Sequence, residues 1–380
     1  MSWDITGLGA VASIGDDPRS VYDALCAGRS GLTDLHAFDG DKYRAKQAYE
    51  IDDRGPDGAD RPLRATRWLE TAVEQALTDA GLDTAADDIP ILVGTTLREQ
   101  RSAELWWRDG APLTVRDLHF GSALRDRFGT ARSYTFANAC AATLYTLGMA
   151  TDMIELGLTD TVVVAGTDSI TESAFGTLDR VQNETPRALR PFDRARAGML
   201  MGEGSVAVVV QRTGAARRGV HAVVRGVSMN CDAAHPTAPD PTTISWAIRD
   251  AHRRAGLKAD EIDLVMLHGS GTQLNDSAEA TAVSGVFEGA GAGPLLTAIK
   301  SMTGHTLGGS GLLSLVTAAF ALRHGVVPPV LGLTDPIDEA AGLRLVRDRA
   351  ATARLSTAQI NAFGFGGINA VAVLEKGDRT

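Results

Sequence analysis

Three stretches of the sequence carry residues that could act together as a nucleophile and its hydrogen-bond donors. Cys140 lies in FANACAAT, His268 lies in LVMLHGSGT, and Lys300 and His305 flank the turn of AIKSMTGHT. A thiol that attacks a carbonyl needs an activating group, and imidazoles can supply proton transfer or donors to an oxyanion. Taken alone, Lys300 and His305 could equally be the polar tips of an exposed turn. Together the three stretches predict covalent catalysis by Cys140.

Cys140 by itself has a second interpretation, because a free cysteine is more often a small buried core residue. SYTFANAC is typical of a strand, and AATLYTLGMATDMIELGL is typical of a helix with Leu144, Leu147, Ile154 and Leu158 at helical spacing. Cys140 is then expected at a helix N-terminus. Unpaired N–H groups and the helix dipole there would stabilise a thiolate and lower the pKa of the thiol.

The other candidate residues also have structural alternatives. His268 follows a predicted strand and precedes Gly-Ser-Gly, a place where ligands collect in α/β sheets, but a core histidine bonded to the backbone is equally compatible. Asp276 and Glu279 lie one helical turn apart, so they could orient a cation, or Asp276 could cap its helix. Phe363 and Phe365 sit among glycines that permit unusual dihedrals, or simply pack a turn.

The positioning elements are predicted to be buried strands that alternate with helices. Five continuous apolar runs indicate strands covered on both faces. They are ILVGTT (91–96), TVVVAGTDS (161–169), SVAVVVQRT (205–213), DLVMLHGSGT (263–272) and INAVAVLEK (368–376). Helical patterns such as ATRWLETAVEQALTDAGL lie between them, which indicates an α/β protein. Asp39–Arg61 and Leu97–Phe128 have weak patterning and are predicted to form surface or substrate-facing loops.

Two pairs of segments repeat along the chain in the same order. The pairs are 68–96 with 246–272, and 202–213 with 364–377. Each repeat has a helix, Ala-Gly-Leu, a short acidic link and a strand, and later a Gly-rich turn before a Val-rich strand. Preserved order favours a duplicated unit over chance similarity. We expect an N-terminal half at 1–214 that carries Cys140 and a C-terminal half at 215–380 that carries both histidines.

Composition limits the classes of function. The 380 residues carry a formal net charge of −10, which disfavours a general nucleic-acid binder. Cys26, Cys140 and Cys231 are widely spaced without a CxxC pair, so neither a disulfide framework nor a metal site is indicated. The segment MSWDITGLGA lacks the features of a signal peptide, and no apolar run reaches the roughly 18 residues of a membrane helix. A cytoplasmic enzyme without a membrane segment is expected.

The motifs together resemble the elongating β-ketoacyl-acyl carrier protein synthases of the thiolase superfamily, nearly end to end. The matching segments are NACAAT, HGSGT with Asp276 and Glu279, Lys300 with Gly304-His305, RPFD through Gly202-Glu203-Gly204, and FGFGGINA. The resemblance implies a thiolase fold, in which two βαβαβ-type halves form a five-layered αβαβα sandwich. It also implies that the chain needs no cofactor of its own, since phosphopantetheine arrives on the carrier protein.

The resemblance implies a Cys-His-His condensing enzyme. Cys140 would take an acyl chain from acyl carrier protein, and His268 and His305 would hydrogen-bond the malonyl thioester while it loses carbon dioxide. The resulting enolate would attack the acyl group, with the oxyanion held by the backbone N–H groups of Cys140 and Phe365. Phe365 would also gate the acyl pocket, and Lys300 would pair with Glu279 to orient the histidines. The resemblance also implies supporting roles for Glu279 and Asp276. It places Ser270, Thr272, Phe363 and Asn369 near the substrate, and Phe363 and Asn369 would support the turn of Phe365.

Departures from the family pattern favour a specialised synthase, for example of a type II polyketide pathway, over a housekeeping fatty-acid enzyme. Ser270 replaces a threonine, Gln273-Leu-Asn-Asp276 replaces Pro-x-Gly-Asp, Ile368 replaces a threonine, and the chain is short. A chain-length-factor-like subunit would lack Cys140. An acyltransferase without decarboxylation would usually show His and Asn, and a papain-like hydrolase does not fit the duplicated strands.

The family also implies two partners. One is a second synthase-like chain, in a homodimer or in a heterodimer with a chain-length-factor-like homologue. The other is an acidic carrier protein, for which Arg61, Arg64 and Arg67 offer a docking surface at spacing three on one side of a helix start. The alternative for these arginines is an ordinary solvated face.

Overall fold

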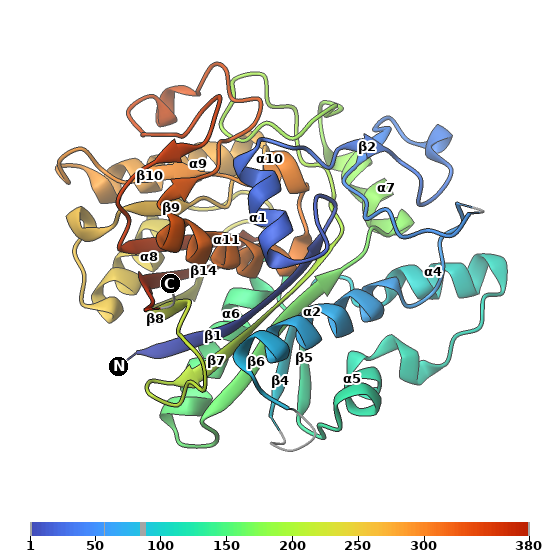
Figure 1. Cartoon of the computed structure of the whole chain (residues 1–380). Coiled ribbons are helices and arrows are strands. Elements are labelled where there is room, and N and C mark those ends of the chain that lie inside the picture. The colour runs from blue at the N-terminus through green and yellow to red at the C-terminus, as the bar shows by residue number, and fades with distance from the viewer. Residues whose placement is uncertain (1, 57, 84–88, 379–380) are drawn as a thin grey trace.

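The computed structural model describes residues 2–56, 58–83 and 89–378, and its centre is a ten-stranded sheet (Figure 1). The strand order is β10-β9-β13-β14-β8-β1-β7-β6-β4-β5. The strands are β1 Trp3–Ala12, β4 Ile91–Thr95, β5 Ser133–Ala137, β6 Thr161–Asp168, β7 Gly204–Arg212, β8 Ala222–Cys231, β9 Leu264–Met266, β10 Leu295–Thr297, β13 Thr357–Gly364 and β14 Ile368–Lys376. All five predicted strands are confirmed.

The sheet contains the same arrangement twice. The order β5-β4-β6-β7-β1 in one half corresponds to β10-β9-β13-β14-β8 in the other, with the same parallel and antiparallel pairings. The halves join where Trp3–Ile5 of β1 pairs antiparallel with Ala222–Val224 of β8. The repeated topology explains the repeated sequence pattern. The acidic link at 84–88 lies outside the described residues, and the domain boundary after residue 214 stays a prediction.

Helices form three layers around the two halves of the sheet. The helices are α1 Pro18–Cys26, α2 Arg64–Ala80, α4 Gln100–Asp109, α5 Phe120–Phe128, α6 Ala142–Glu155, α7 Glu172–Val181, α8 Pro241–Ala255, α9 Gln273–Phe287, α10 Lys300–Thr303 and α11 Ser310–His324. Figure 1 shows α2 lying along β1 and β7, whereas α8 and α9 cover the other half. Helices α6 and α11 lie between the halves and contact both. The expected five layers are therefore present.

The middle layer explains why its helices lack a polar face. Every residue of α11 from Ser310 to Leu322 is buried, as expected for a helix enclosed by other elements on all sides. On α6, Leu144, Leu147 and Ile154 are buried as predicted, but the helix ends at Glu155. Leu158 lies beyond the helix and is exposed, so its assignment to the buried stripe was wrong.

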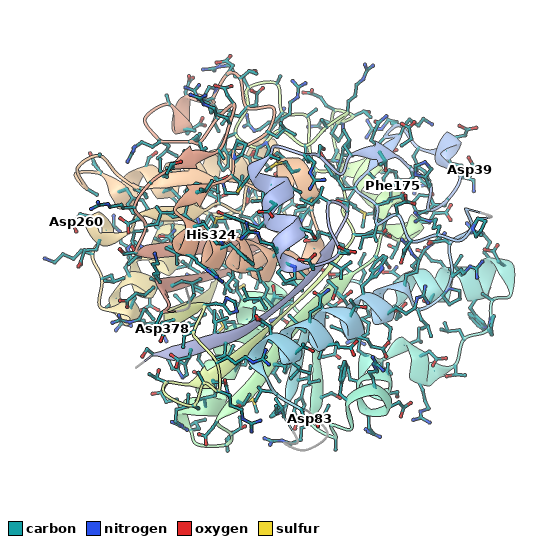
Figure 2. All side chains as sticks on the ribbon, in the orientation of Figure 1. Asp39, Asp83, Phe175, Asp260, His324 and Asp378 are labelled. Carbon is teal, nitrogen blue, oxygen red and sulfur yellow. The ribbon has the colours of Figure 1, made fainter. Side chains whose placement is uncertain are left out.

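The weakly patterned segment 97–128 is not a loop, because it contains α4 and α5. The buried face of α4 includes Arg101 and Ser102, whose polar side chains hide the apolar stripe that normally reveals a helix. Apart from residue 57, which is not described, the segment 39–61 does lack long elements. Its neighbour Phe38 packs with Tyr43 against Phe175 of α7, which is labelled in Figure 2. In the described part of the chain, no helix has both the length and the apolar character to cross a membrane.

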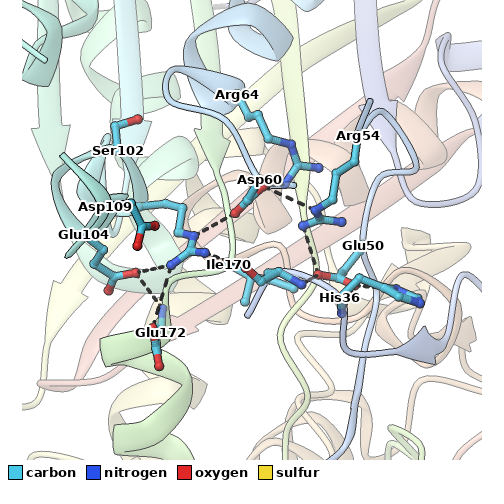
Figure 3. Close-up of polar contacts among 12 residues, drawn as sticks. His36, Glu50, Arg54, Asp60, Arg64, Ser102, Glu104, Asp109, Ile170 and Glu172 are labelled. Atoms are coloured by element: carbon cyan, nitrogen blue, oxygen red, sulfur yellow. Dashed lines mark hydrogen bonds and ion pairs between the residues drawn. The ribbon is translucent and has the colours of Figure 1, made fainter. Parts of the chain in front are cut away.

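Arg64 is not a docking residue, because it is buried at the start of α2 and only 3% exposed. Its guanidinium lies 2.6 Å from Asp53, 2.7 Å from Asp60 and 3.0 Å from Glu203. Figure 3 shows Arg54 and Arg64 converging on Asp60. Arg61 just before the helix and Arg67 in its first turn are exposed, whereas Arg64 is buried, a difference that spacing alone does not reveal.

We expect Arg64→Met to lower the free energy of unfolding by about 3–5 kcal/mol, because removing one partner leaves buried carboxylates uncompensated. Arg67→Met, at an exposed position on the same helix, should change it by about 0.5 kcal/mol or less. Denaturant unfolding followed by circular dichroism measures both. Equal stability of the two variants would contradict a structural role for Arg64.

Candidate active site

Cys140 lies in a tight turn that links β5 to α6. Ala139, just before it, has a φ of 47°, so the chain reverses sharply and Ala139–Ala141 form a short 3-10 turn. Gly94 of β4 lies against this region, where a Cβ atom would come within 2.7 Å of the backbone of Ala142. Gly364 approaches from the other side, where an added Cβ atom would lie 3.2 Å from the Cys140 nitrogen. These close approaches fix Cys140 between both halves of the molecule.

The thiol of Cys140 does not have the lowered pKa that its position at a helix start predicts. Burial raises its pKa to about 11, while Lys300 and the backbone N–H groups of Phe365 and Cys140 lower it. Desolvation disfavours the thiolate more than these groups stabilise it. The resting site therefore holds a neutral thiol. The N–H groups of Phe365 and Cys140 nevertheless face the sulfur, which agrees with the expected oxyanion hole.

Two histidines reach the same site from separate turns. His268 follows β9, and His305 follows α10 after Gly304, whose φ is 66°. The two imidazole rings lie 5.3 Å apart at 78° to each other. His305 is held by its own backbone, which exchanges hydrogen bonds with Leu200 and Gly202. The RPFD-to-GEG segment of the sequence thus has a structural role: it positions His305.

The hydrogen-bond partners assign a tautomer to each imidazole. Nδ1 of His305 accepts the backbone N–H of Leu307 over 3.2 Å, so its proton is on Nε2. Nδ1 of His268 lies 3.5 Å from the Lys300 ammonium nitrogen, so its proton is also on Nε2. The Nε2 atom of His305 is buried without a hydrogen-bond partner in the described residues. It is an N–H donor for which the described residues provide no acceptor.

Both imidazoles are neutral at neutral pH. Burial lowers the pKa of His268 and of His305 well below the usual value, and the nearby Lys300 charge lowers both further. Burial also lowers the pKa of Lys300, to about 8, against the carboxylate of Glu279, which raises it. A neutral imidazole donates one hydrogen bond without giving up its proton. The pair is therefore suited to stabilise a developing oxyanion.

Glu279 and Lys300 support His268 through its backbone. Glu279 accepts the N–H groups of His268 and Gly269 over 2.7 and 2.8 Å. Lys300 donates to the carbonyl oxygen of His268. We expected Lys300 and Glu279 to pair directly. In the described part of the chain, both side chains instead hydrogen-bond the backbone of His268. Asp276 acts further away, since it accepts from Phe192 and Gly271.

One cavity brings most of the predicted site residues together. Besides Cys140 and the two histidines, it is lined by Ser270, Thr272, Phe363 and Phe365. Phe365 is 46% exposed at its mouth, as expected of a gate. Asn369 does not line the cavity: it is fully buried on β14 opposite Phe363, and its amide donates to Asn230 over 3.0 Å. These contacts agree with the implied role of Asn369 in supporting the turn, whereas its assignment to substrate binding stays a prediction.

Sequence reasoning missed three features of the site. Asp168 ends β6 and accepts from Thr95, Leu97 and Gly308, so it links two strand ends to the turn that follows His305. Its position directly after a buried strand was a usable signal. The segment 235–239 and Met199 also line the cavity. Nothing in their sequences distinguishes them from ordinary loop residues.

The geometry of the site by itself indicates a class of enzyme. A buried thiol, two neutral imidazole donors and two backbone N–H groups share one cavity, which suits acyl transfer through a thioester with an oxyanion intermediate. The sequence matches "Beta-ketoacyl synthase, N-terminal domain" over residues 4–216 and "Beta-ketoacyl synthase, C-terminal domain" over residues 221–334. The chain belongs to the β-ketoacyl synthase family and is an acyltransferase of the 3-oxoacyl-acyl carrier protein synthase type.

Individual relatives match over nearly the whole chain. The ketoacyl synthase alpha subunit of the tetracenomycin polyketide synthase of Streptomyces glaucescens is 33% identical, with 99% of this chain and 97% of that protein covered. The 3-oxoacyl-[acyl-carrier-protein] synthase 2 of Coxiella burnetii is 28% identical, with 98% of each covered. The solved structure of the ishigamide ketosynthase/chain length factor superposes with a TM-score of 0.88 at 30% identity, covering 99% of each chain. The predicted thiolase fold is confirmed.

Proposed function

We propose that the protein catalyses decarboxylative condensation of malonyl-acyl carrier protein with an acyl chain held as a thioester on Cys140. The observation that carries the proposal is the pair of neutral imidazoles, His268 and His305, with donors on Nε2 in the cavity of Cys140. Loss of carbon dioxide from the malonyl group leaves an enolate, and these donors stabilise its oxygen. The enolate carbon then attacks the thioester carbon and forms a tetrahedral oxyanion, which collapses and expels the Cys140 thiolate. Protonation of this thiolate restores the neutral thiol.

The direct test supplies acyl- and malonyl-carrier protein together and measures carbon dioxide and product mass. The proposal expects equimolar carbon dioxide and a product two carbons longer with a 3-keto group. An acyltransferase that makes esters or amides would move the acyl group without carbon dioxide. A chain-length-factor-like subunit would do neither, although the presence of Cys140 already argues against it. A panel of acyl chains in the same assay would define the substrate.

We further propose that the setting is a polyketide or related natural-product pathway and that a second synthase-like chain is the partner. Two of the relatives described above support this: one is a polyketide synthase alpha subunit at 33% identity, and the other is a ketosynthase/chain length factor at 30% identity. The structure offers an edge for the partner, because β5 ends the sheet and its Tyr134 is half-exposed. An unpaired edge strand readily pairs with a strand from another chain. The oligomeric state, alone and with a chain-length-factor-like homologue, tests this proposal.

Carrier-protein docking is now proposed for Arg61 and Arg67, the two exposed arginines at the start of α2. Reversing the charge in Arg67→Glu should raise the apparent KM for acyl-carrier protein several-fold at low salt and leave kcat unchanged, because rim charges act mainly on association. Arg253→Glu, on α8 at the opposite outer layer, is the matched control. An unaltered KM in Arg67→Glu would remove this surface from docking.

A further inference from the structure

A chain of buried hydrogen bonds leads from the outer helix α8 to the catalytic His268. The His252 Nε2 atom on α8 lies 2.7 Å from Gln359 Oε1. Gln359 Nε2 donates to Asn361 Oδ1 over 2.7 Å, and Asn361 Nδ2 donates to Glu279 Oε1 over 3.0 Å. Glu279 in turn accepts the backbone N–H of His268. Four side chains in series thus connect the surface layer to the residue that faces the substrate.

All four side chains of this hydrogen-bonded series are buried. Gln359 and Glu279 are fully buried, and His252 and Asn361 are 5% and 1% exposed. Gln359 and Asn361 are two residues apart on β13, so both project from the same face of the sheet toward α8 and α9. Apolar side chains pack around the series. The Phe287 ring, for example, lies 5.8 Å from the ring of His252. A buried polar group without its partner is costly, so each member depends on the next.

The acceptor at the end sets the direction of every bond. The ionised carboxylate of Glu279 only accepts, so Asn361 must present its NH₂ group to it. The carbonyl oxygen of Asn361 then faces Gln359, which must present its own NH₂ group. The remaining carbonyl oxygen of Gln359 requires a proton on Nε2 of His252. All donors point toward Glu279, and hydrogen bonds aligned in this way strengthen one another.

We propose that His252 and Gln359 are positioning residues for the condensing reaction: they hold the Asn361 amide against Glu279 and so keep this carboxylate ionised behind His268. An ionised Glu279 can accept the N–H groups of His268 and Gly269 as well as the Asn361 amide. A protonated Glu279 cannot accept all three with equal strength, and the backbone that carries the His268 imidazole loses its anchor. The inference rests on the proposed function, because condensation supplies its kinetic readout.

The surroundings of Glu279 give the sign of the expected pH effect. Burial raises its pKa to about 7, bonds from Gly269 and Asn361 lower it, and Asp276 on the same helix raises it. Lys300 on α10 and the His268 turn face it from the other side. Removing a donor to the ionised form raises the pKa further. The active, ionised form is then lost at a higher pH than in the wild-type protein as the pH falls.

At the end of the series away from Glu279, His252 is neutral. Among the described groups, Arg249, one turn earlier on α8, is the one charge that affects the pKa of His252. Burial lowers the pKa of His252, the bond to Gln359 raises it and Arg249 lowers it further. A proton gained by this imidazole would leave the Nε2–H donor to Gln359 in place. A shift in the acid limb, the part of the pH–rate profile where activity falls at low pH, would therefore report the protonation of Glu279.

The experiment compares two substitutions at one position. Protein with Cys140 already acylated is mixed with malonyl-carrier protein, and single-turnover condensation is followed across pH for wild type, His252→Leu and His252→Gln. His252→Leu removes the donor to Gln359 and should move the acid limb up by about half a pH unit. His252→Gln places an amide nitrogen where Nε2 was and should retain the wild-type limb. The alkaline limb should not move, since Glu279 is ionised there in all three proteins.

A second variant and a second readout keep the proposal open to refutation. Gln359→Met, similar in shape but without the amide, should shift the acid limb as His252→Leu does. A uniform loss of rate at every pH, or an unmoved acid limb in both variants, would overturn the proposal and leave these residues a packing role. NMR titration of ¹³C-labelled glutamate, with Glu279→Gln for assignment, measures the pKa of Glu279 without any turnover. A wild-type protein that forms no condensation product would reject the proposed function, while the titration would still decide the positioning role.

Discussion

Cys140→Ala should lose the acyl adduct and with it all condensation. Incubation of the wild-type protein with acyl-carrier protein should add one acyl mass, located by peptide mapping on the peptide that contains Cys140. The alanine variant has no sulfur to form the thioester, so the condensation rate should fall by several orders of magnitude, on the order of 10⁴-fold or more. The expected loss is large because Cys140 is the one cysteine among the described residues that line the cavity.

The matched control for this prediction is Cys231→Ala. Cys231 is exposed at the end of β8, and its thiol contacts the carbonyl of Gly366. A reactive exposed thiol could take up an acyl group without any role in catalysis, so this variant should keep both the Cys140 adduct and the rate. An adduct that persists in Cys140→Ala, accompanied by product, would place the nucleophile elsewhere.

The buried neutral thiol of Cys140 has a consequence for when acylation occurs. Burial holds its pKa near 11, so thiolate is scarce before the substrate arrives. The groups that lower this pKa, Lys300 and two backbone N–H groups, also face the sulfur. These groups can therefore stabilise the negative charge that develops on the sulfur when the thiol reacts. Such a site limits reaction with small electrophiles in solution and reserves the thiol for a positioned thioester.

Most of the fold and the location of the site could be predicted because both depend on local patterns. The five strands are continuous apolar runs, and the turns after them contain the reactive residues and glycines at fixed spacing. Duplication then required the two halves to adopt the same strand order, which the sheet confirms. Cys140, His268 and His305 could be grouped because each follows a strand or turn that such topology brings to the same edge.

The incorrect predictions concern quantities that depend on burial. Arg64 and Arg67 are three residues apart, yet within the described ranges only Arg64 forms ion pairs with acidic side chains, those of Asp53 and Glu203 among them. The pKa of Cys140 follows from desolvation by both halves of the molecule, which a helix-start pattern does not reveal. Each error came from inferring the surroundings of a side chain from sequence proximity.

His305→Ala should separate the two steps of the reaction, acylation of Cys140 and decarboxylation of malonyl-carrier protein. Acylation of Cys140 should continue, because the N–H groups of Cys140 and Phe365 remain in place. Release of carbon dioxide from malonyl-carrier protein should fall by about 10²–10³-fold, the usual effect of losing one oxyanion donor. Mass spectrometry of the acyl adduct and trapping of labelled carbon dioxide measure the two steps on one sample. Normal release from His305→Ala would reject its role as an enolate donor.

His305→Gln provides the control that distinguishes donation from packing. The glutamine amide nitrogen can occupy the position of Nε2, so this variant should recover part of the decarboxylation that alanine loses. His268→Ala should resemble His305→Ala, since both imidazoles serve one oxygen. The double alanine variant should then lose less than the product of the single effects, because residues that act as a unit are not additive. Full multiplication of the two losses would show that the histidines stabilise different charges, and the shared-oxyanion mechanism would need revision.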